Sequence, residues 1–144
     1  MTFQLFVEET KITDRFAPDI TDQDDPYVLV DVGKVDQAWK KSGSGYVGST
    51  GEGGIAGRYD RFEKFWKEGH TIVAPVISVR ENGAVEFTNG RHRFAYLRDQ
   101  GMKRIPVSMD TEDLKLAKKF NLVVKVLPKK KGIGHSYGKA SGKS

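Results

Sequence analysis

The 144-residue sequence contains no cysteine and no long apolar run. Without cysteine, a disulfide scaffold, a thiol nucleophile and cysteine-ligated metal sites are excluded. No apolar stretch approaches the roughly 20 residues that a bilayer-spanning helix needs. The first residues, MTFQLFVEET, carry acids where a secretory signal carries positive charge. We therefore expect a soluble, cytoplasmic protein with no membrane partner.

Acidic charge is scarce in most of the chain. The formal net charge is +5, yet residues 1–36 hold 9 acids against 3 bases, which leaves a net charge of +11 over the remaining residues. A surface that binds a polyanion, if the protein has one, is therefore expected after residue 36. Charge alone does not identify the polyanion, because a basic balance is also what a solvated surface shows.

The hydrophobic pattern predicts a single α+β domain with a mixed sheet and helices packed on it. Strands are expected at residues 2–7, 27–32, 71–79, 85–88, 103–109 and 122–127. Pro75 is expected at an edge or a bulge, and Asn82-Gly83 forms a hairpin turn. Helices are expected at residues 35–41, 58–68 and 90–100, and a fourth helix is expected to start at Thr111 as its cap. The predicted domain covers residues 1–128.

Two segments have unusual compositions. Residues 42–57 contain seven glycines and one charged side chain, which predicts a loop. Loops of this length are either functional or disordered, and both readings stay open. Residues 129–144 hold five lysines and no acid, which predicts a flexible basic tail whose Lys129, Lys130 and Lys131 contact nucleic acid.

The run FTNGRHRF, residues 87–94, is the most informative about function. A strand ends, the chain turns at Asn89-Gly90, and a helix begins whose free N–H groups attract anions. Arg91, His92 and Arg93 then occupy the first turn, where positive charge opposes the helix dipole. A bound phosphate would remove this conflict, so residues 89–93 are predicted to bind phosphate.

A purely structural explanation of the same run stays open. Arg91 and Arg93 could pair with acids such as Asp60, Glu63 or Asp99. His92 would then be a hydrogen-bonded, partly buried histidine.

The segment VAPVISVRENGAVEFTNGRHRFAYLRDQGMKRIPVSM, residues 73–109, resembles the core of the ParB/sulfiredoxin-like superfamily. That family shares a strand, a turn, a His-Arg pair that opens a helix, and a following Ile-Pro-Val. The resemblance implies a ParB/sulfiredoxin-like fold in which Gly90, His92 and Arg93 contact the phosphates of a nucleotide. Arg91 stands where sulfiredoxin has its catalytic cysteine, which excludes that reductase chemistry. Asn89 stands where nuclease-like members often have Asp.

Two functions follow as expectations. The first is a small ParB-like nuclease or NTPase of a mobile element or toxin, with His92, Arg93 and Asp60 as catalytic residues, ATP or CTP as ligand, and Mg²⁺ held by unidentified ligands. Glu52 and Asp31 are weaker candidates for the carboxylate. The second is a non-catalytic module that binds DNA or a nucleotide and regulates a larger assembly. A scaffold that has kept the fold alone is a third reading.

Overall fold

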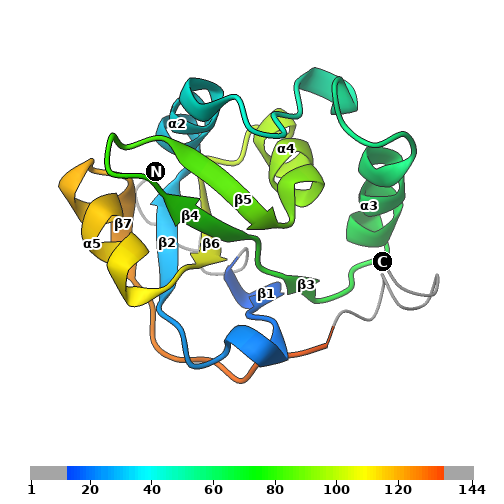
Figure 1. Cartoon of the computed structure of the whole chain (residues 1–144). Helices are drawn as coiled ribbons and strands as arrows, with labels where there is room; N and C mark the ends of the chain where they lie inside the picture. The colour runs from blue at the N-terminus through cyan, green and yellow to red at the C-terminus, as the bar shows by residue number, and fades with distance from the viewer. Residues whose placement is uncertain (1–12, 135–144) are drawn as a thin grey trace, which may run out of the picture.

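The computed structural model describes residues 13–134, so the strand predicted at residues 2–7 lies outside the described part. Strands and helices alternate along most of the chain (Figure 1). The strands are β1 (Phe16–Ala17), β2 (Tyr27–Asp31), β3 (Ile72–Val73), β4 (Val76–Val79), β5 (Val85–Asn89), β6 (Arg104–Ser108) and β7 (Val123–Val126). The α-helices are α2 (Val32–Ser42), α3 (Arg58–Lys67), α4 (Arg91–Asp99) and α5 (Thr111–Lys119), with short 3₁₀ turns η1 (Ile20–Asp22) and η2 (Ser49–Gly51).

Five strands form the main sheet in the order β5-β4-β6-β2-β7. Its neighbouring strands are antiparallel except for β4 and β6, which pair in parallel through Val76 and Ser108. A second, two-stranded sheet pairs β1 with β3 in parallel. The predicted α+β class, with helices packed on a mixed sheet, is confirmed.

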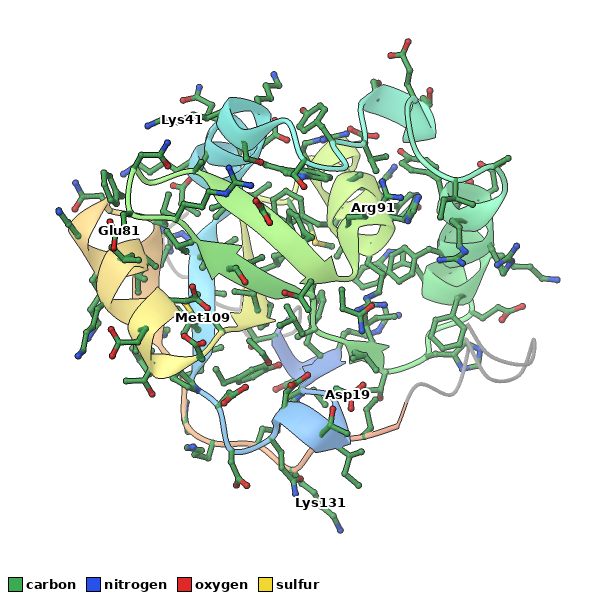
Figure 2. The ribbon with its side chains drawn as sticks, in the orientation of Figure 1. Asp19, Lys41, Glu81, Arg91, Met109 and Lys131 are labelled. Atoms are coloured by element: carbon green, nitrogen blue, oxygen red, sulfur yellow. The ribbon has the colours of Figure 1, made fainter. Side chains whose placement is uncertain are left out.

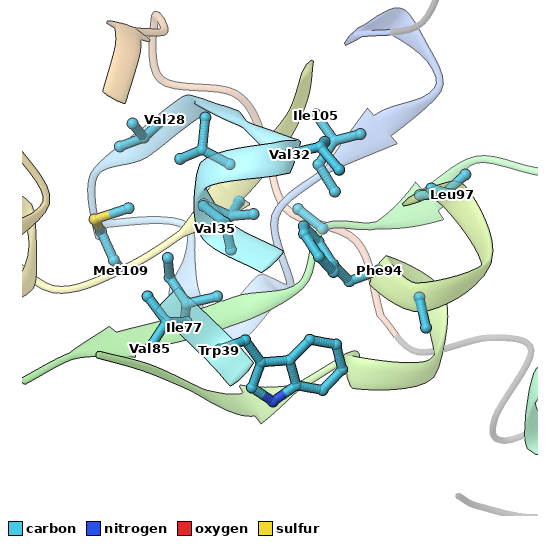
Figure 3. Close-up of a cluster of buried hydrophobic side chains, with 14 of the residues drawn as sticks. Val28, Val32, Val35, Trp39, Ile77, Val85, Phe94, Leu97, Ile105 and Met109 are labelled. Atoms are coloured by element: carbon cyan, nitrogen blue, oxygen red, sulfur yellow. The ribbon is translucent and has the colours of Figure 1, made fainter. Parts of the chain in front are cut away.

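The core lies on both faces of β2, an interior strand of the sheet between β6 and β7. Val28, Leu29 and Val30 are all fully buried, and successive side chains of a strand point to opposite faces. Helices α2 and α4 cover one face, where Trp39 and Phe94 pack edge to face with ring centroids 5.9 Å apart (Figure 3). This packing fixes where α4 begins.

The chain leaves β2 one residue earlier than the pattern predicts. Val32 was expected to end the strand, but it is the first residue of α2. The reason is Asp31, whose carboxylate accepts a hydrogen bond from the backbone N–H of Lys34 over 2.9 Å and so caps the helix. Helix α2 therefore starts three residues before the predicted Val35, and Asp31 has a structural role.

Residues 71–79 form two short strands where one was predicted. Ala74 and Pro75 separate β3 from β4, and the two strands belong to different sheets. The carbonyl oxygen of Pro75 accepts from the N–H of Ser108, whereas the N–H of Ala74 donates to Ala17. Pro75 has no N–H for a ladder, so the chain changes partners there.

The other predicted elements are observed with shifts of a residue or two at their ends. Helix α5 is capped by Asp110, whose carboxylate accepts from the N–H of Asp113 over 2.8 Å, and Thr111 is its first residue. Helix α3 is present at the predicted position, and it buries Tyr59 and Phe62. None of the helices within residues 13–134 combines the length and the apolar character that crossing a bilayer requires.

Residues 129–134 are held against the body of the protein, contrary to the flexible tail predicted from residue 129 on. Lys129 Nζ donates to the carbonyl oxygen of Asp24 over 2.5 Å, and Lys130 Nζ donates to that of Phe16 over 2.6 Å. Ile133 forms a parallel bridge with Asp19. We call residues 129–134 the C-terminal clasp. Residues 135–144 lie outside the described part of the chain.

Candidate functional site

The predicted strand–turn–helix unit is present where β5 meets α4. Gly90 separates the two elements with φ 83° and ψ 20°, in the left-handed region, and no side chain caps the helix. A Cβ at this position would lie 2.5 Å from Nη2 of Arg93 and 2.9 Å from Cα of Pro75. Both the dihedral angle and the space therefore require glycine here. The first turn of α4 carries Arg91, His92 and Arg93 and no acid.

His92 is buried beneath the glycine-rich loop. Its side chain is 8% exposed, and its Nε2 accepts a hydrogen bond from the backbone N–H of Ile55 over 2.9 Å. Burial, followed by the positive charges of Arg91, Arg58 and Arg93, lowers the pKa of His92 to about 4. The imidazole is therefore neutral at pH 7, and because Nε2 accepts, the proton is on Nδ1.

Arg91 and Arg93 occupy different environments. Arg91 is partly exposed, and its Nη1 donates to the carbonyl oxygen of Gly45 over 2.8 Å (Figure 2). Arg93 is 6% exposed, and its guanidinium lies against Gly90. Among the ion pairs observed within residues 13–134, none joins Arg91 to Asp60, Glu63 or Asp99, and Asp99 pairs with Arg98. The structural explanation holds for His92, which is buried and hydrogen-bonded.

Each of the three basic side chains packs against a glycine. Gly45 would bring a Cβ to 3.4 Å from Cδ of Arg91, and Gly54 would bring one to 2.7 Å from Nε2 of His92. A Cβ at Gly90 would likewise come within 2.5 Å of Nη2 of Arg93. Two of these glycines belong to the loop, so the loop backbone runs directly over the basic side chains. This contact explains part of the glycine content of residues 42–57.

The loop is also fastened to the far end of α4. Arg98 lies at the centre of this attachment: its Nη1 donates to Asp36 Oδ1 over 3.0 Å and to the carbonyl oxygen of Val47 over 2.8 Å. The hydroxyl of Tyr46 donates to Asp36 over 2.9 Å. Burial and this hydrogen bond raise the pKa of Tyr46 to about 12, so the hydroxyl keeps its proton.

A second acid at the same end of α4 binds the next part of the loop. Asp99 Oδ2 accepts from the backbone N–H of Thr50 over 3.0 Å and from the hydroxyl of Tyr59 over 2.5 Å. Its other oxygen, Oδ1, pairs with Arg98 at 3.0 Å. The sequence contained a weak signal for this cluster, because Arg98 and Asp99 were visible in the helix, but nothing in the local spacing connected them to Asp36.

The predicted catalytic carboxylates are not brought to His92. Asp60 is exposed in the first turn of α3, and within residues 13–134 no observed hydrogen bond or ion pair joins it to His92 or Arg93. Glu52 is exposed on the loop. Asp31 caps α2. In the part of the chain that the structure describes, no group of three or more histidines, aspartates and glutamates is arranged to hold a metal ion.

The lysines predicted to bind nucleic acid lie away from this site. The amino groups of Lys129 and Lys130 donate hydrogen bonds to backbone carbonyl oxygens, and Lys131 is exposed. Lys131 and Arg91 are at opposite ends of the molecule (Figure 2). A small ligand bound at Arg91 would therefore not reach the clasp, whereas an extended polymer could contact both. No family model, curated protein or solved structure matches the chain.

Proposed function

We propose that the chain binds the phosphate groups of a nucleotide or nucleic acid at the start of α4. The observation that carries this proposal is the helix start itself: Arg91, His92 and Arg93 occupy the first turn of α4, which contains no acid and has no side-chain cap. Positive side chains oppose the positive end of the helix dipole, and a bound phosphate would relieve that conflict. The N–H groups at the start of α4 add a favourable dipole.

The sequence resemblance to the ParB/sulfiredoxin-like superfamily supports the same proposal. Gly90, His92 and Arg93 are the positions that match that family, and they lie together at one helix start. ATP and CTP are the ligands that follow from the resemblance. A non-catalytic nucleotide- or DNA-binding module is the form of the proposal that we favour, because Nε2 of His92 is already engaged by the loop.

The second candidate function is a phosphohydrolase, which the neutral protonation state of His92 favours. A neutral imidazole whose Nε2 carries a lone pair can take a proton from water once Ile55 releases it. In that reaction Arg91 and Arg93 would hold phosphate charge, and Mg²⁺ bound to the phosphates would neutralise the rest. Asp60 would have to act from the first turn of α3, where no hydrogen bond or ion pair observed within residues 13–134 joins it to His92.

The binding proposal is tested by titrating the purified protein with pyrophosphate, ATP, CTP, and single- and double-stranded oligonucleotides, with and without Mg²⁺. Arg91→Ala should weaken binding about 10- to 100-fold, since a charge-assisted hydrogen bond contributes roughly 1.5–3 kcal/mol. Arg80→Ala is the matched control, because Arg80 is exposed and pairs with Glu86 beside the β4–β5 turn. Equal affinities for the wild-type protein and Arg91→Ala would reject the site.

Catalysis is tested separately by following ATP and DNA turnover in the wild-type protein and in His92→Gln. Circular dichroism should first establish that the variant is folded, because His92 is buried. A hydrolase predicts turnover that falls sharply in His92→Gln, whereas a binding module predicts none in either protein. Turnover that is unchanged in His92→Gln would exclude the role assigned to His92.

A further inference from the structure

The glycine-rich loop uses the same atoms that a phosphate would need. Nε2 of His92 accepts from the N–H of Ile55, and Nη1 of Arg91 donates to the carbonyl oxygen of Gly45. A phosphate oxygen is an acceptor, so Nε2 could bind it only as a donor, after taking a proton. Nε2 cannot accept from Ile55 and donate to a phosphate at the same time. The loop contact and a phosphate contact at this atom are therefore mutually exclusive.

The two halves of the loop are attached with different strength. Residues 46–50 are anchored, because Val47 is fully buried, Tyr46 packs on Trp39 with ring centroids 4.6 Å apart, and Thr50 donates to Asp99. Residues 51–57, which we call the flap, contribute no buried apolar side chain: Glu52 and Ala56 are exposed, and Ile55 is 49% exposed. Release of the flap therefore costs little apolar burial.

The backbone at the junction of these halves and within the flap suits a hinge. Thr50 has φ 54°, in the left-handed region that a β-branched residue rarely adopts, and Gly51 follows with φ 92°. Gly53 and Gly57 also have positive φ, and Gly57 is the last residue before α3. Hinges need positions that tolerate large dihedral changes, and glycine provides them.

We propose that the flap occupies the basic site in the free protein. A phosphate that binds there displaces the flap from His92. The inference rests on the proposed function, because it assigns the closed form to the phosphate-free state. Arg58, the first residue of α3, is close enough to His92 to act on its charge, so it would meet the same anion. The expected ligand is a compound that carries two or more phosphates, since basic groups from both α3 and α4 then meet it.

Gly54→Ala tests the displacement without changing any side chain that would touch phosphate. The new Cβ would lie 2.7 Å from Nε2 of His92, so it pushes the flap away from the histidine. If the flap competes with the ligand, Gly54→Ala should bind pyrophosphate about three- to tenfold more tightly than the wild-type protein. Gly134→Ala is the matched control, because no atom of residues 13–134 lies within 4 Å of a Cβ there, and its affinity should not change.

Hydrogen exchange supplies a second readout that needs no variant. In the wild-type protein, exchange of the amides in residues 51–57 should rise several-fold when pyrophosphate is added. Slower exchange in this segment on binding, or weaker binding by Gly54→Ala, would overturn the inference, because the flap would then be part of the bound site. If Gly54→Ala does not fold, the exchange of the wild-type protein decides alone.

The failure of the inference and the failure of the proposed function give different results. If binding depends on Arg91 but the flap does not move, only the inference is rejected. An absence of pyrophosphate binding in the wild-type protein, in Gly54→Ala and in Gly134→Ala removes the proposed function and the inference together. Binding by Gly54→Ala alone would support both, since the closed flap would then exclude the ligand completely.

Discussion

The backbone N–H of Ile55 donates a hydrogen bond to Nε2 of His92, which joins the glycine-rich loop to the start of α4. The imidazole can accept this bond only while it is neutral. The pKa of His92 is lowered from 6.5 to about 4 by burial and by three nearby arginines, so the folded protein resists protonation there. The contact is thus sensitive to acid.

We predict that stability falls as the pH drops from about 6.5 to about 4. In that range an unfolded chain binds a proton at this histidine and the folded chain does not, so protonation favours unfolding. Above pH 6.5 the contribution is complete, and below pH 4 it is lost. One pKa unit corresponds to about 1.4 kcal/mol, so a shift from 6.5 to about 4 limits the loss to at most about 3.5 kcal/mol.

Urea unfolding at several pH values checks this prediction. His92→Gln should show a shallower fall than the wild-type protein between pH 6.5 and 4, because glutamine does not titrate. A wild-type slope in His92→Gln would contradict the assignment.

Arg98→Met should lower the free energy of unfolding by about 3–5 kcal/mol, the range typical of breaking a buried ion pair. Its side chain is 13% exposed, and removing it leaves the carboxylates of Asp36 and Asp99 without their shared cation. Chemical denaturation measures the change. Lys115→Met removes an exposed pair with Glu112 and should cost less than about 1 kcal/mol. Similar losses in both variants would show that the Arg98 cluster does not fasten the loop.

Tyr46→Phe should loosen the anchored half of the loop. It removes the hydroxyl that donates to Asp36 and keeps the ring on Trp39, so the expected loss is about 1 kcal/mol. Hydrogen exchange of residues 46–50 should become faster. Tyr96→Phe, a matched substitution on the α3 side of α4, should leave this exchange as it is. If both variants behave alike, the hydroxyl of Tyr46 is not part of the anchor.

Gly132→Ala should destabilise the C-terminal clasp. A Cβ there would lie 2.7 Å from Cα of Ile20 and 2.9 Å from the carbonyl oxygen of Asp19, and backbone atoms cannot move aside cheaply. We expect a loss of about 1–3 kcal/mol in thermal or urea unfolding. Gly134→Ala, two residues further on, should be neutral, because a Cβ there has no neighbour within 4 Å in the described part of the chain. An unchanged stability in Gly132→Ala would mean that the clasp does not contribute to the folded state.

The features that the sequence predicted well are local. The turn at Gly90 followed by a basic helix start depends on a dihedral angle and a periodicity that neighbouring residues determine. The aromatic face of α3 follows from helical spacing in the same way. Two predicted boundaries were wrong because a single side chain or partner determines them. Asp31 caps α2, so Val32 begins a helix instead of ending a strand, and Pro75 separates strands of two different sheets.

The features that the sequence did not reveal join residues far apart in the chain. His92 meets the N–H of Ile55 from 37 positions away, and Arg98 meets Asp36 from 62. Spacing rules describe neighbours on one element, so they contain no information about such pairs. The loop's contact with the site was therefore not visible before the fold was known, although the glycines that permit it were.

The C-terminal clasp determines when the protein can finish folding. Lys129 reaches back 105 positions to Asp24, and Gly132 reaches back 109 positions to Gln23. Contacts this distant in sequence require most of the chain to be ordered first, which slows folding. A nascent chain arrested before residue 130 would therefore lack the hydrogen bond that Lys130 donates to the carbonyl oxygen of Phe16, and the β1–η1 corner would wait for the end of synthesis to be closed.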